Sequence, residues 1–192
     1  MFTLLSGLYS MITAKQDYYI TILGLDNAGK TTFLQAAQLR SRSGTIPTVG
    51  LNIGQLEIDS RKRLKFWDLG GQTELQSLWE KYYDEAHAII FVVDSTDRER
   101  IDAVREALET VLINDKVEGL PILMLANKQD MPDALSVSDI QAIFNKIAEL
   151  LSARDSKVLP ISALEGTGVK EALDWLVVRL ERNSKNRPPV VD

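Results

Sequence analysis

Hydrophobic positions along this chain follow two recurring patterns, which predict strands and helices in alternation. The runs 88–93 and 121–126 are apolar throughout, as in strands that are buried on both faces of a parallel sheet. Two stretches with a period of two flank the polar segment 59–62, so we expect a hairpin turn there. The predicted strands span 18–23, 51–58, 64–66, 88–93, 121–126 and 158–161.

Helical periodicity fills most of the intervals between these strands. The predicted helices span 30–40, 98–114, 136–151 and 168–182. A strand followed by a helix, repeated along the chain, is typical of a doubly wound α/β fold. We therefore expect a mostly parallel six-stranded sheet with one antiparallel edge strand and helices on both faces. The predicted organisation is one domain at 15–182, an amphipathic N-terminal helix at 1–14 and a flexible tail at 183–192.

The N-terminal helix is predicted from its apolar face. On a helical wheel one half holds apolar side chains, and the other half holds small polar ones. The apolar half includes Phe2, Leu5, Leu8 and Ile12. No charged side chain precedes Lys15, so this helix would bind membranes by apolar insertion, with little attraction to anionic headgroups. A helix packed on the protein core is the competing interpretation, and both stay open.

Composition and charge exclude several classes of function. The 192 residues include 22 Lys and Arg against 27 Asp and Glu, a net charge of −5, whereas nucleic-acid-binding proteins usually carry a basic excess. The sequence has no cysteine, which excludes disulfides, thiolate metal sites, prenylation and palmitoylation. Phe2 stands where N-myristoylation requires glycine. We therefore expect no nucleic-acid partner and no lipid anchor.

A phosphate-binding loop lies between the first predicted strand and the first predicted helix. The sequence GLDNAGKT at 24–31 matches the pattern G-x-x-x-x-G-K-[ST] without a mismatch. Backbone N–H groups of such a loop point at phosphate oxygens, and the helix N-terminus adds its positive end. Lys30 would bind the β- and γ-phosphates, and Thr31 would bind Mg²⁺. The residues expected to contact the nucleotide here are Gly24, Asp26, Asn27, Ala28, Gly29, Lys30, Thr31 and Thr32.

Guanine specificity is predicted at the end of the fifth predicted strand. Asn127, Lys128 and Asp130 follow this strand in the pattern N-K-x-D. The Asp130 carboxylate can accept N–H bonds from N1 and N2 of guanine, whereas adenine would leave it poorly paired. Asn127 would brace the loop, and Lys128 would pack along the base. A backbone N–H in the segment that contains Ser162 and Ala163 would meet the guanine carbonyl.

A magnesium site is expected beside the phosphate-binding loop. Asp68, in the run WDLGGQ, is placed as the carboxylate that reaches Mg²⁺ through water. Thr48, in the run PTVG, is expected to complete the metal shell together with Thr31. The predicted cofactor is therefore Mg²⁺, with GTP or GDP as the ligand.

Hydrolysis of the nucleotide is assigned to Gln72, which would orient the attacking water, and to Lys30. Gly71 would bring its N–H to the γ-phosphate, because it has no side chain in the way. Arg40 and Arg42 flank the loop that carries Thr48. They are expected to be surface charges, and so are poor candidates for an arginine finger. We therefore expect slow intrinsic hydrolysis, with an activating protein supplying the missing charge.

Taken in order, the runs GLDNAGKT, PTVG, WDLGGQ, NKQD and SAL resemble the ADP-ribosylation factor (Arf) branch of the Ras-like small GTPases, over nearly the whole chain. The opening residues, the run 49–54 and the tail 187–189 are most similar to the Arf-related subgroup associated with the trans-Golgi. The resemblance implies a Ras-like P-loop GTPase fold and a GDP/GTP switch. It also implies that the hairpin at 51–66 slides between the two states, and that the N-terminal helix leaves the core on GTP binding.

The resemblance further implies an effector surface and a set of partners. An aromatic triad forms this surface in the family; Trp67 and Tyr82 match it, whereas the first position is Leu51. The implied partners are a nucleotide exchange factor, a GTPase-activating protein, Golgi effectors and a membrane, with a membrane receptor for the N-terminus. The chain would be a monomer that cycles between cytosol and trans-Golgi membranes.

Three functions compete for this sequence. The first is a switch that binds and slowly hydrolyses GTP, and that regulates Golgi and endosomal membrane traffic by recruiting effectors. The second is a nucleotide-locked scaffold with negligible turnover, against which Gln72, Thr48 and Lys30 argue. The third is an ATP-dependent kinase, which Asn127 and Asp130 disfavour.

Overall fold

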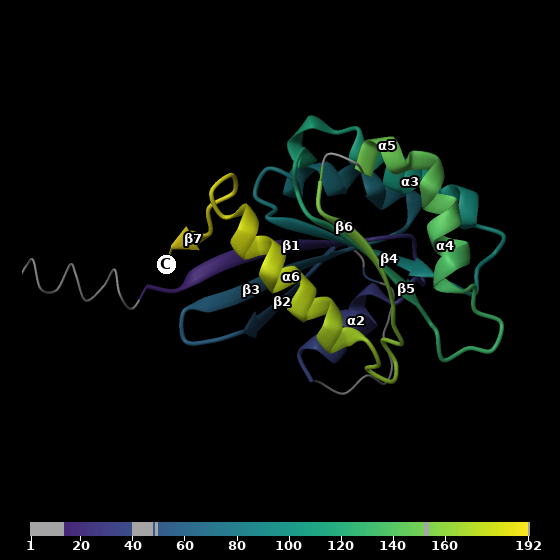
Figure 1. Cartoon of the computed structure of the whole chain (residues 1–192), viewed down its shortest axis with the longest axis horizontal. Helices are drawn as coiled ribbons and strands as arrows, with labels where there is room; N and C mark the ends of the chain where they lie inside the picture. Colours follow the sequence, from purple (N-terminus) through teal and green to yellow (C-terminus); the bar gives the residue numbers. More distant parts are fainter. Residues whose placement is uncertain (1–13, 40–47, 49, 152–153, 192) are drawn as a thin grey trace, which may run out of the picture.

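A computed structural model describes residues 14–39, 48, 50–151 and 154–191 (Figure 1). The predicted N-terminal helix lies outside the described residues, with Phe2, Leu5, Leu8 and Ile12. Arg40 and Arg42 also lie outside them. Among the described residues, no helix combines the length and the apolar character needed to cross a membrane.

A single mixed sheet organises the molecule, with strand order β2-β3-β1-β4-β5-β6. Neighbouring strands are parallel except β2, which pairs antiparallel with β3 at the edge. This arrangement confirms the predicted fold class, and β7 adds a short strand that the sequence did not predict. The strands are β1 (Gln16–Leu23), β2 (Leu51–Glu57), β3 (Lys62–Leu69), β4 (Ala88–Asp94), β5 (Ile122–Asn127), β6 (Ser156–Pro160) and β7 (Val190–Val191).

Helices flank both faces of the sheet. The α-helices are α2 (Lys30–Ala37), α3 (Ile101–Leu112), α4 (Val137–Phe144), α5 (Ala148–Leu151) and α6 (Val169–Asn183). Three 3₁₀ segments are η1 (Thr73–Tyr82), η2 (Asp115–Val117) and η3 (Asn145–Ile147). The predicted helix 136–151 consists of α4, η3 and α5, and Ser136 caps its start by accepting from the Asp139 N–H. No helix was predicted over η1, whose three-residue period differs from that of an α-helix.

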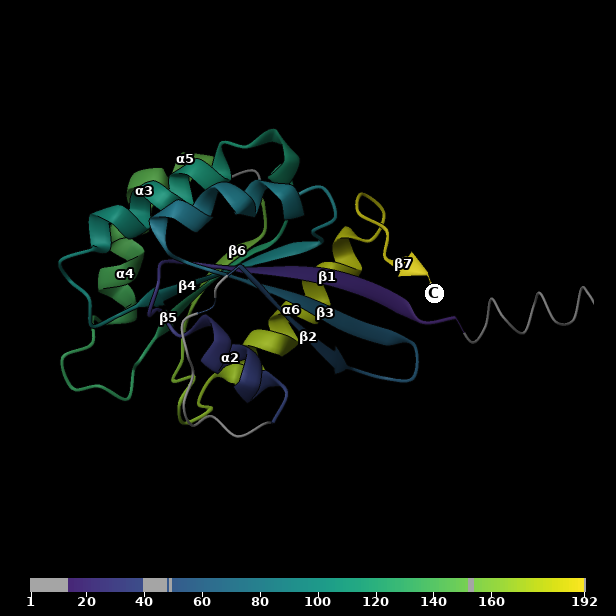
Figure 2. The same ribbon diagram turned by 180° about the vertical axis from the view of Figure 1, so that it is seen from behind.

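Two apolar cores lie on opposite faces of the sheet. Figure 2 shows from behind the helices that flank these two faces. Helices α2 and α6 cover one core, and α3, α4 and α5 cover the other. Alternate residues of β4 supply both cores: Ile89, Phe91 and Val93 point to one face, and Ile90 and Val92 point to the other. Burial on both faces explains why β4 and β5 are apolar throughout.

The polar hairpin turn is built as predicted. The Asp59 carboxylate accepts the N–H groups of Arg61 at 2.7 Å and Lys62 at 2.8 Å, which closes the turn between β2 and β3. Asn52 stands opposite Asp68 across this hairpin. The pairing therefore brings a β2 side chain to the carboxyl end of β3, where the predicted site lies.

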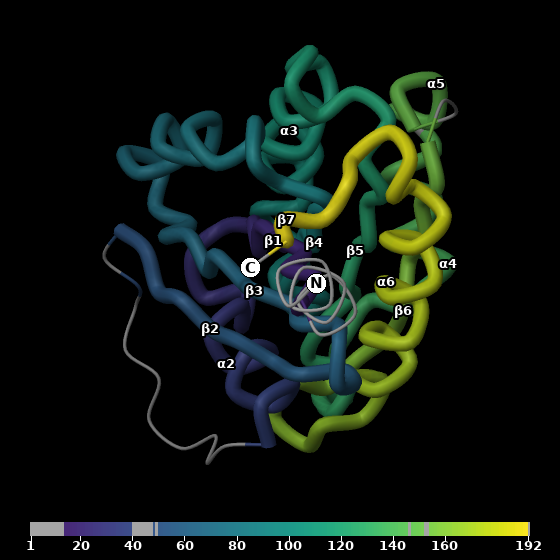
Figure 3. The backbone as a smooth tube through the Cα atoms, turned by 90° about the vertical axis from the view of Figure 1, so that its left-hand side faces the viewer, coloured from purple at the N-terminus to yellow at the C-terminus, as the bar shows by residue number. Residues whose placement is uncertain are grey.

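The C-terminal segment returns to the start of β1 (Figure 3). Arg187 donates to the main-chain carbonyls of Asp84 and Lys116, and the His87 ring Nε2 lies 3.0 Å from the carbonyl oxygen of Pro188. The sequence predicted a flexible tail at 183–192, and flexibility stays a prediction. In the structure, α6 continues to residue 183 and the tail is docked through β7.

Candidate functional site

A cavity of about 320 Å³ opens at the carboxyl end of β1, where parallel α/β sheets usually bind ligands. Most of the side chains that the sequence assigned to phosphate, metal and water meet on its walls. The lining residues are Asp26, Asn27, Gly29, Lys30, Thr31, Thr32, Thr48, Gly71, Gln72 and Lys128. These lining residues come from four separate runs of the chain, all of which the sequence assigned to one nucleotide site.

The phosphate-binding loop needs its two flanking glycines. Gly24 has φ of +135°, and a Cβ there would lie 2.2 Å from the Val92 carbonyl oxygen. Gly29 has φ of +93°, and a Cβ there would lie 2.3 Å from the Asn127 amide nitrogen. Backbone conformation and space thus both require glycine at each position. Between them, Asn27 also adopts a positive φ of 61°, which curls the loop around the cavity.

Lys30 is a buried cation without an ion-pair partner in the loop. Its side chain is 6% exposed, and Nζ donates to the carbonyl oxygens of Gly24 at 2.9 Å and Leu25 at 2.8 Å. Burial lowers the pKa of Lys30 to about 8, although the charges of Asp68 and Asp26 partly oppose the shift. The ammonium group therefore stands at the cavity held only by neutral acceptors.

Asp68 forms an oxygen-rich cluster beside Lys30. Its Oδ2 accepts from Thr31 at 2.6 Å, from Asn52 at 3.3 Å and from Thr48 at 3.4 Å, and the two threonine hydroxyls lie 2.9 Å apart. Burial raises the pKa of Asp68, and these hydrogen bonds only partly offset the rise. Its Oδ1 is buried and has no hydrogen-bond partner among the described residues. Unsatisfied buried oxygen beside two hydroxyls suits a hard cation such as Mg²⁺.

The described residues would supply only a few ligands to such a metal. Over the part of the chain that the structure describes, no group of three or more His, Cys, Asp or Glu side chains could enclose a metal. Mg²⁺ usually keeps waters and takes substrate phosphates as ligands, so a site with few protein oxygens fits it. The residues present therefore fit a metal that arrives with a phosphate ligand.

The segment after β3 packs directly on the phosphate-binding loop. A Cβ on Gly71 would lie 2.3 Å from the Leu25 carbonyl carbon and 2.4 Å from the Asp26 nitrogen, so only glycine allows this approach. The preceding residue, Gly70, is fixed by Trp79, whose ring N–H donates to its carbonyl at 3.0 Å. Gln72 is exposed and lines the cavity. The contacts of Gly70 and Gly71 thus fix the backbone before Gln72, while the Gln72 side chain faces the cavity.

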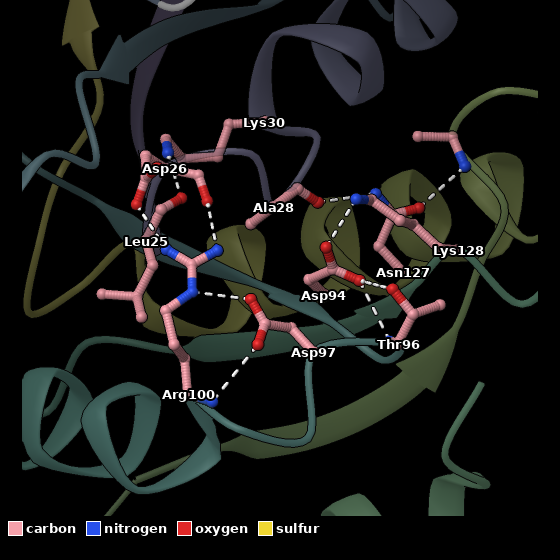
Figure 4. Close-up of polar contacts among 11 residues, drawn as sticks. Leu25, Asp26, Ala28, Lys30, Asp94, Thr96, Asp97, Arg100, Asn127 and Lys128 are labelled. Atoms are coloured by element: carbon pink, nitrogen blue, oxygen red, sulfur yellow. Dashed lines mark hydrogen bonds and ion pairs between the residues drawn. The ribbon is translucent and has the colours of Figure 1, made fainter. Parts of the chain in front are cut away.

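Asn127 joins three segments of the chain on the other side of the cavity (Figure 4). Its amide nitrogen donates to the Ala28 carbonyl at 2.7 Å, and its amide oxygen accepts from the Ala163 N–H at 2.9 Å. Lys128 has a positive φ of 67°, and its Nζ pairs with Asp94 at the end of β4. Asn127 is 2% exposed, and these two bonds brace the phosphate-binding loop, the role predicted from the sequence.

The segment after β6 contains two of the residues predicted to lie at the guanine site. The Ser162 hydroxyl donates to the Asp130 carboxylate at 2.6 Å, so the two predicted residues lie together. The Ser162 N–H, however, donates to Thr167, and the Ala163 N–H donates to Asn127. The N–H groups of Ser162 and Ala163 therefore have protein acceptors, and the contact between a backbone N–H of this segment and the guanine carbonyl stays a prediction.

Several polar residues of the site were missed in the sequence. Arg100, at the start of the predicted helix 98–114, is only half exposed and pairs with Asp26 and Asp97. Its guanidinium group folds back onto the phosphate-binding loop and contacts a residue 74 positions earlier in the chain. Asn52 and Asp94 were also missed. Asp94 had a detectable pattern, since it ends an apolar strand at the same sheet edge.

The residues expected to form an effector surface are partly assembled. The rings of Trp67 and Tyr82 lie 5.2 Å apart, and Tyr19 extends the row at 4.8 Å from Trp67. Leu51 is 37% exposed on the edge strand β2. Trp79, in the segment after Gln72, is buried at 3% exposure.

Comparison with known proteins matches the sequence of this chain to one family. Residues 4–180 match the model of the ADP-ribosylation factor family. The chain is 54% identical to ADP-ribosylation factor-like protein 3 of Saccharomyces cerevisiae, with 99% of each chain covered. It is 48% identical to human ADP-ribosylation factor-related protein 1, with 98% of this chain and 97% of the relative covered.

A solved structure agrees with the sequence relatives. The structure of the Arl6 BBS3 small GTPase from Trypanosoma brucei with bound nucleotide analogue GppNp has a TM-score of 0.78 and 32% identity, and covers 86% of this chain and 98% of its own. Fold, motifs and relatives thus agree. The chain belongs to the ADP-ribosylation factor family, and is a small GTPase, a regulatory GTP-binding switch that hydrolyses GTP to GDP.

Proposed function

We propose that the cavity binds GTP or GDP together with Mg²⁺, and that the GTP-bound protein recruits effectors in Golgi and endosomal membrane traffic. One observation carries the proposal: the buried Lys30 ammonium and the Asp68 cluster converge on one cavity. A cation for phosphate oxygens beside oxygen ligands for a hard metal is what a magnesium nucleotide requires.

The phosphates would be bound by exchange of hydrogen bonds. Lys30 would release the carbonyls of Gly24 and Leu25 and donate to phosphate oxygens instead, with no carboxylate to displace. Thr31 and Thr48 would hold Mg²⁺, with Asp68 reaching it through water. When bound, Mg²⁺ neutralises charge on the β- and γ-phosphates.

Guanine would be selected by Asp130, held in place by Ser162. Its carboxylate matches the two N–H donors of guanine, which adenine lacks. Nucleotide competition tests this: GTP and GDP should displace bound fluorescent GDP, and ATP should not. Asp130→Asn should weaken guanine nucleotide binding, whereas Asp133→Asn, an exposed neighbour in the same loop, should not. Displacement by ATP as effective as that by GTP would overturn the assignment of guanine selection to Asp130.

Hydrolysis would depend on Gln72 as the residue that orients water and on Lys30 as the residue that neutralises charge. An activating protein would supply the charge that an arginine finger provides to the transition state. The test is single-turnover GTP hydrolysis with and without such a protein. Gln72→Leu should lower the rate of GTP hydrolysis in the presence of the activating protein by about 100-fold or more.

A control variant makes the hydrolysis test specific. Gln141→Leu changes an exposed glutamine on α4, far along the chain from the cavity, and should hydrolyse GTP like the wild type. If the wild type and Gln72→Leu are equally inert with an activating protein, the alternative of a nucleotide-locked scaffold replaces the enzyme proposal.

Effector recruitment is proposed for the surface of Leu51, Trp67 and Tyr82. The support is the contact between the Trp67 and Tyr82 rings and the partial exposure of Leu51 on a hairpin that we propose to slide on GTP binding. A pull-down that compares GTP-loaded with GDP-loaded protein tests the proposal. Golgi proteins captured only by the GTP-loaded form are expected, and Tyr82→Ala should release them.

Membrane attachment is proposed for the N-terminal segment. Met1 would be retained before the bulky Phe2, and acetylation would remove its charge, so that the end inserts at lower cost. Flotation with liposomes tests this with the acetylated, GTP-loaded protein. The full chain should float, whereas the chain without residues 1–13 should stay at the bottom. Equal flotation of both would contradict the proposal and shift attention to a protein receptor.

A further inference from the structure

One arginine ties the phosphate-binding loop to the start of α3. The Arg100 guanidinium group donates to the Asp26 carboxylate at 2.6 Å and to the Asp26 carbonyl at 3.4 Å (Figure 4). Its Nε donates to Asp97 at 2.6 Å, and the Arg100 main-chain N–H donates to the other oxygen of that carboxylate at 3.2 Å. Asp97 therefore fixes the guanidinium group in the orientation that meets the loop.

Asp26 lies where the loop touches the segment after β3. It lines the cavity, and its nitrogen lies 2.4 Å from the place that a Cβ on Gly71 would take. Gly71 is the residue expected to contact the γ-phosphate. The Asp26 carboxylate is thus attached to the part of the loop that is nearest to the third phosphate of a bound nucleotide.

A free carboxylate at this place would oppose nucleotide binding in two ways. It would repel the phosphates, and it would compete for the Lys30 ammonium group, whose pKa already responds to the Asp26 charge. Both effects would be larger for a triphosphate than for a diphosphate, because the additional charged group lies beside Lys30. A bound arginine removes both effects.

We propose that Arg100 is a positioning residue that neutralises and holds the Asp26 carboxylate, and so sets the preference of the site for guanosine triphosphate over diphosphate. The inference rests on the proposed function, because it takes the cavity as the nucleotide site. Arg100 acts through Asp26, since its donors are directed to Asp26 and Asp97.

The test measures the ratio of GTP to GDP affinity, which a purely structural role would not change. Fluorescent GDP and a non-hydrolysable fluorescent GTP analogue are titrated into the full chain with Mg²⁺. Arg100→Ala should lower this ratio about fivefold, the size expected for a half-exposed charge pair. In an Asp26→Asn background the same substitution should change the ratio less than about twofold.

Arg105→Ala serves as the matched control. Arg105 lies further along α3, where it pairs with Asp102 and Glu109, and its removal should leave the ratio at the wild-type value. Thermal unfolding of each variant checks that it is folded, and Arg100→Gln replaces Arg100→Ala if the latter does not fold.

The outcomes separate the inference from the function on which it rests. Equal loss of GDP and GTP affinity in Arg100→Ala, or no loss, would overturn the role of Arg100 while the nucleotide site stands. A loss of the ratio that persists in the Asp26→Asn background would also overturn it. A wild-type chain that binds neither nucleotide would instead contradict the proposed function.

Discussion

Two buried carboxylates on neighbouring strands have opposite surroundings. Asp17 on β1 is 1% exposed and Asp68 on β3 is fully buried. Arg63 donates to both oxygens of Asp17, at 2.6 and 2.7 Å, and Lys65 adds a contact at 2.5 Å. Asp68 receives only hydroxyl and amide donors, all on one oxygen.

The pKa values follow from these surroundings. Burial raises the pKa of both groups, but at Asp17 the hydrogen bonds from Arg63 and Lys65 outweigh it, so that this pKa is lowered. At Asp68 burial dominates and the pKa is raised. The comparison teaches that two buried carboxylates on neighbouring strands can have opposite pKa shifts, because cations of the same chain pair with one and not with the other.

The largest expected effect comes from substitution of Asp68, the carboxylate with one unsatisfied oxygen. Asp68→Asn should weaken magnesium-dependent GTP binding about 100-fold, since it removes a carboxylate that orients the metal shell. The free energy of unfolding without nucleotide should stay unchanged or rise, because the raised pKa means that the folded state disfavours this charge. Titration of fluorescent GTP with Mg²⁺ and with EDTA, beside urea unfolding, measures both. An unaltered dependence on Mg²⁺ would refute the assignment.

The second largest effect is expected from substitution of Asp17, the carboxylate that is paired with Arg63 and Lys65. Asp17→Asn should lower the free energy of unfolding by about 2 kcal/mol, because two cations lose their buried partner. GTP affinity should stay at the wild-type value. Since the folded pKa of Asp17 is lowered from 3.8, the stability that it contributes is present above that pH and disappears as the pH falls through the lowered value.

Urea unfolding at several pH values measures the Asp17 effect. The control is Asp174→Asn, which removes the exposed pair with Lys170 and should change stability by less than about 0.5 kcal/mol. A similar loss in both variants would show that burial at Asp17 contributes nothing special.

The smallest expected effect concerns Lys30, the buried ammonium group beside Asp68. The pKa of Lys30 is about 8, so the ammonium group loses its proton above that pH when no nucleotide is bound. Phosphate binding needs the charged form, so GTP affinity should fall about tenfold from pH 7 to pH 9, with proton uptake on binding. Lys30→Arg stays charged and should show a flatter profile. Parallel profiles would assign the pH dependence to other groups, including guanine itself.

Much of the fold was predictable because its causes are local. The apolar runs of β4 and β5 follow from burial on both faces, and the phosphate-binding loop follows from glycines whose positive φ values permit its curl. The η1 segment and the docked tail were not predictable, since a 3₁₀ period and a two-residue strand leave weak patterns. The Arg187 contacts, for example, join residues 103 positions apart.

The candidate site shows the same division. The sequence identified Lys30, Thr31 and Asp68 from motif and context, and the cavity brings them together. It did not identify the Arg100 contact with Asp26, because a mixed run of charges has the same pattern whether it faces water or folds back onto a loop.

The sequence by itself determined which chemical groups this protein places at the ends of its strands, because strand and loop patterns fix side-chain order locally. Only the tertiary structure decided which of those groups are satisfied. Asp17 and Asp68 are the same residue type, and nothing near either in the chain distinguishes their protonation. Burial and long-range partners decide it, since the free energy of a charge depends on everything that surrounds it in space.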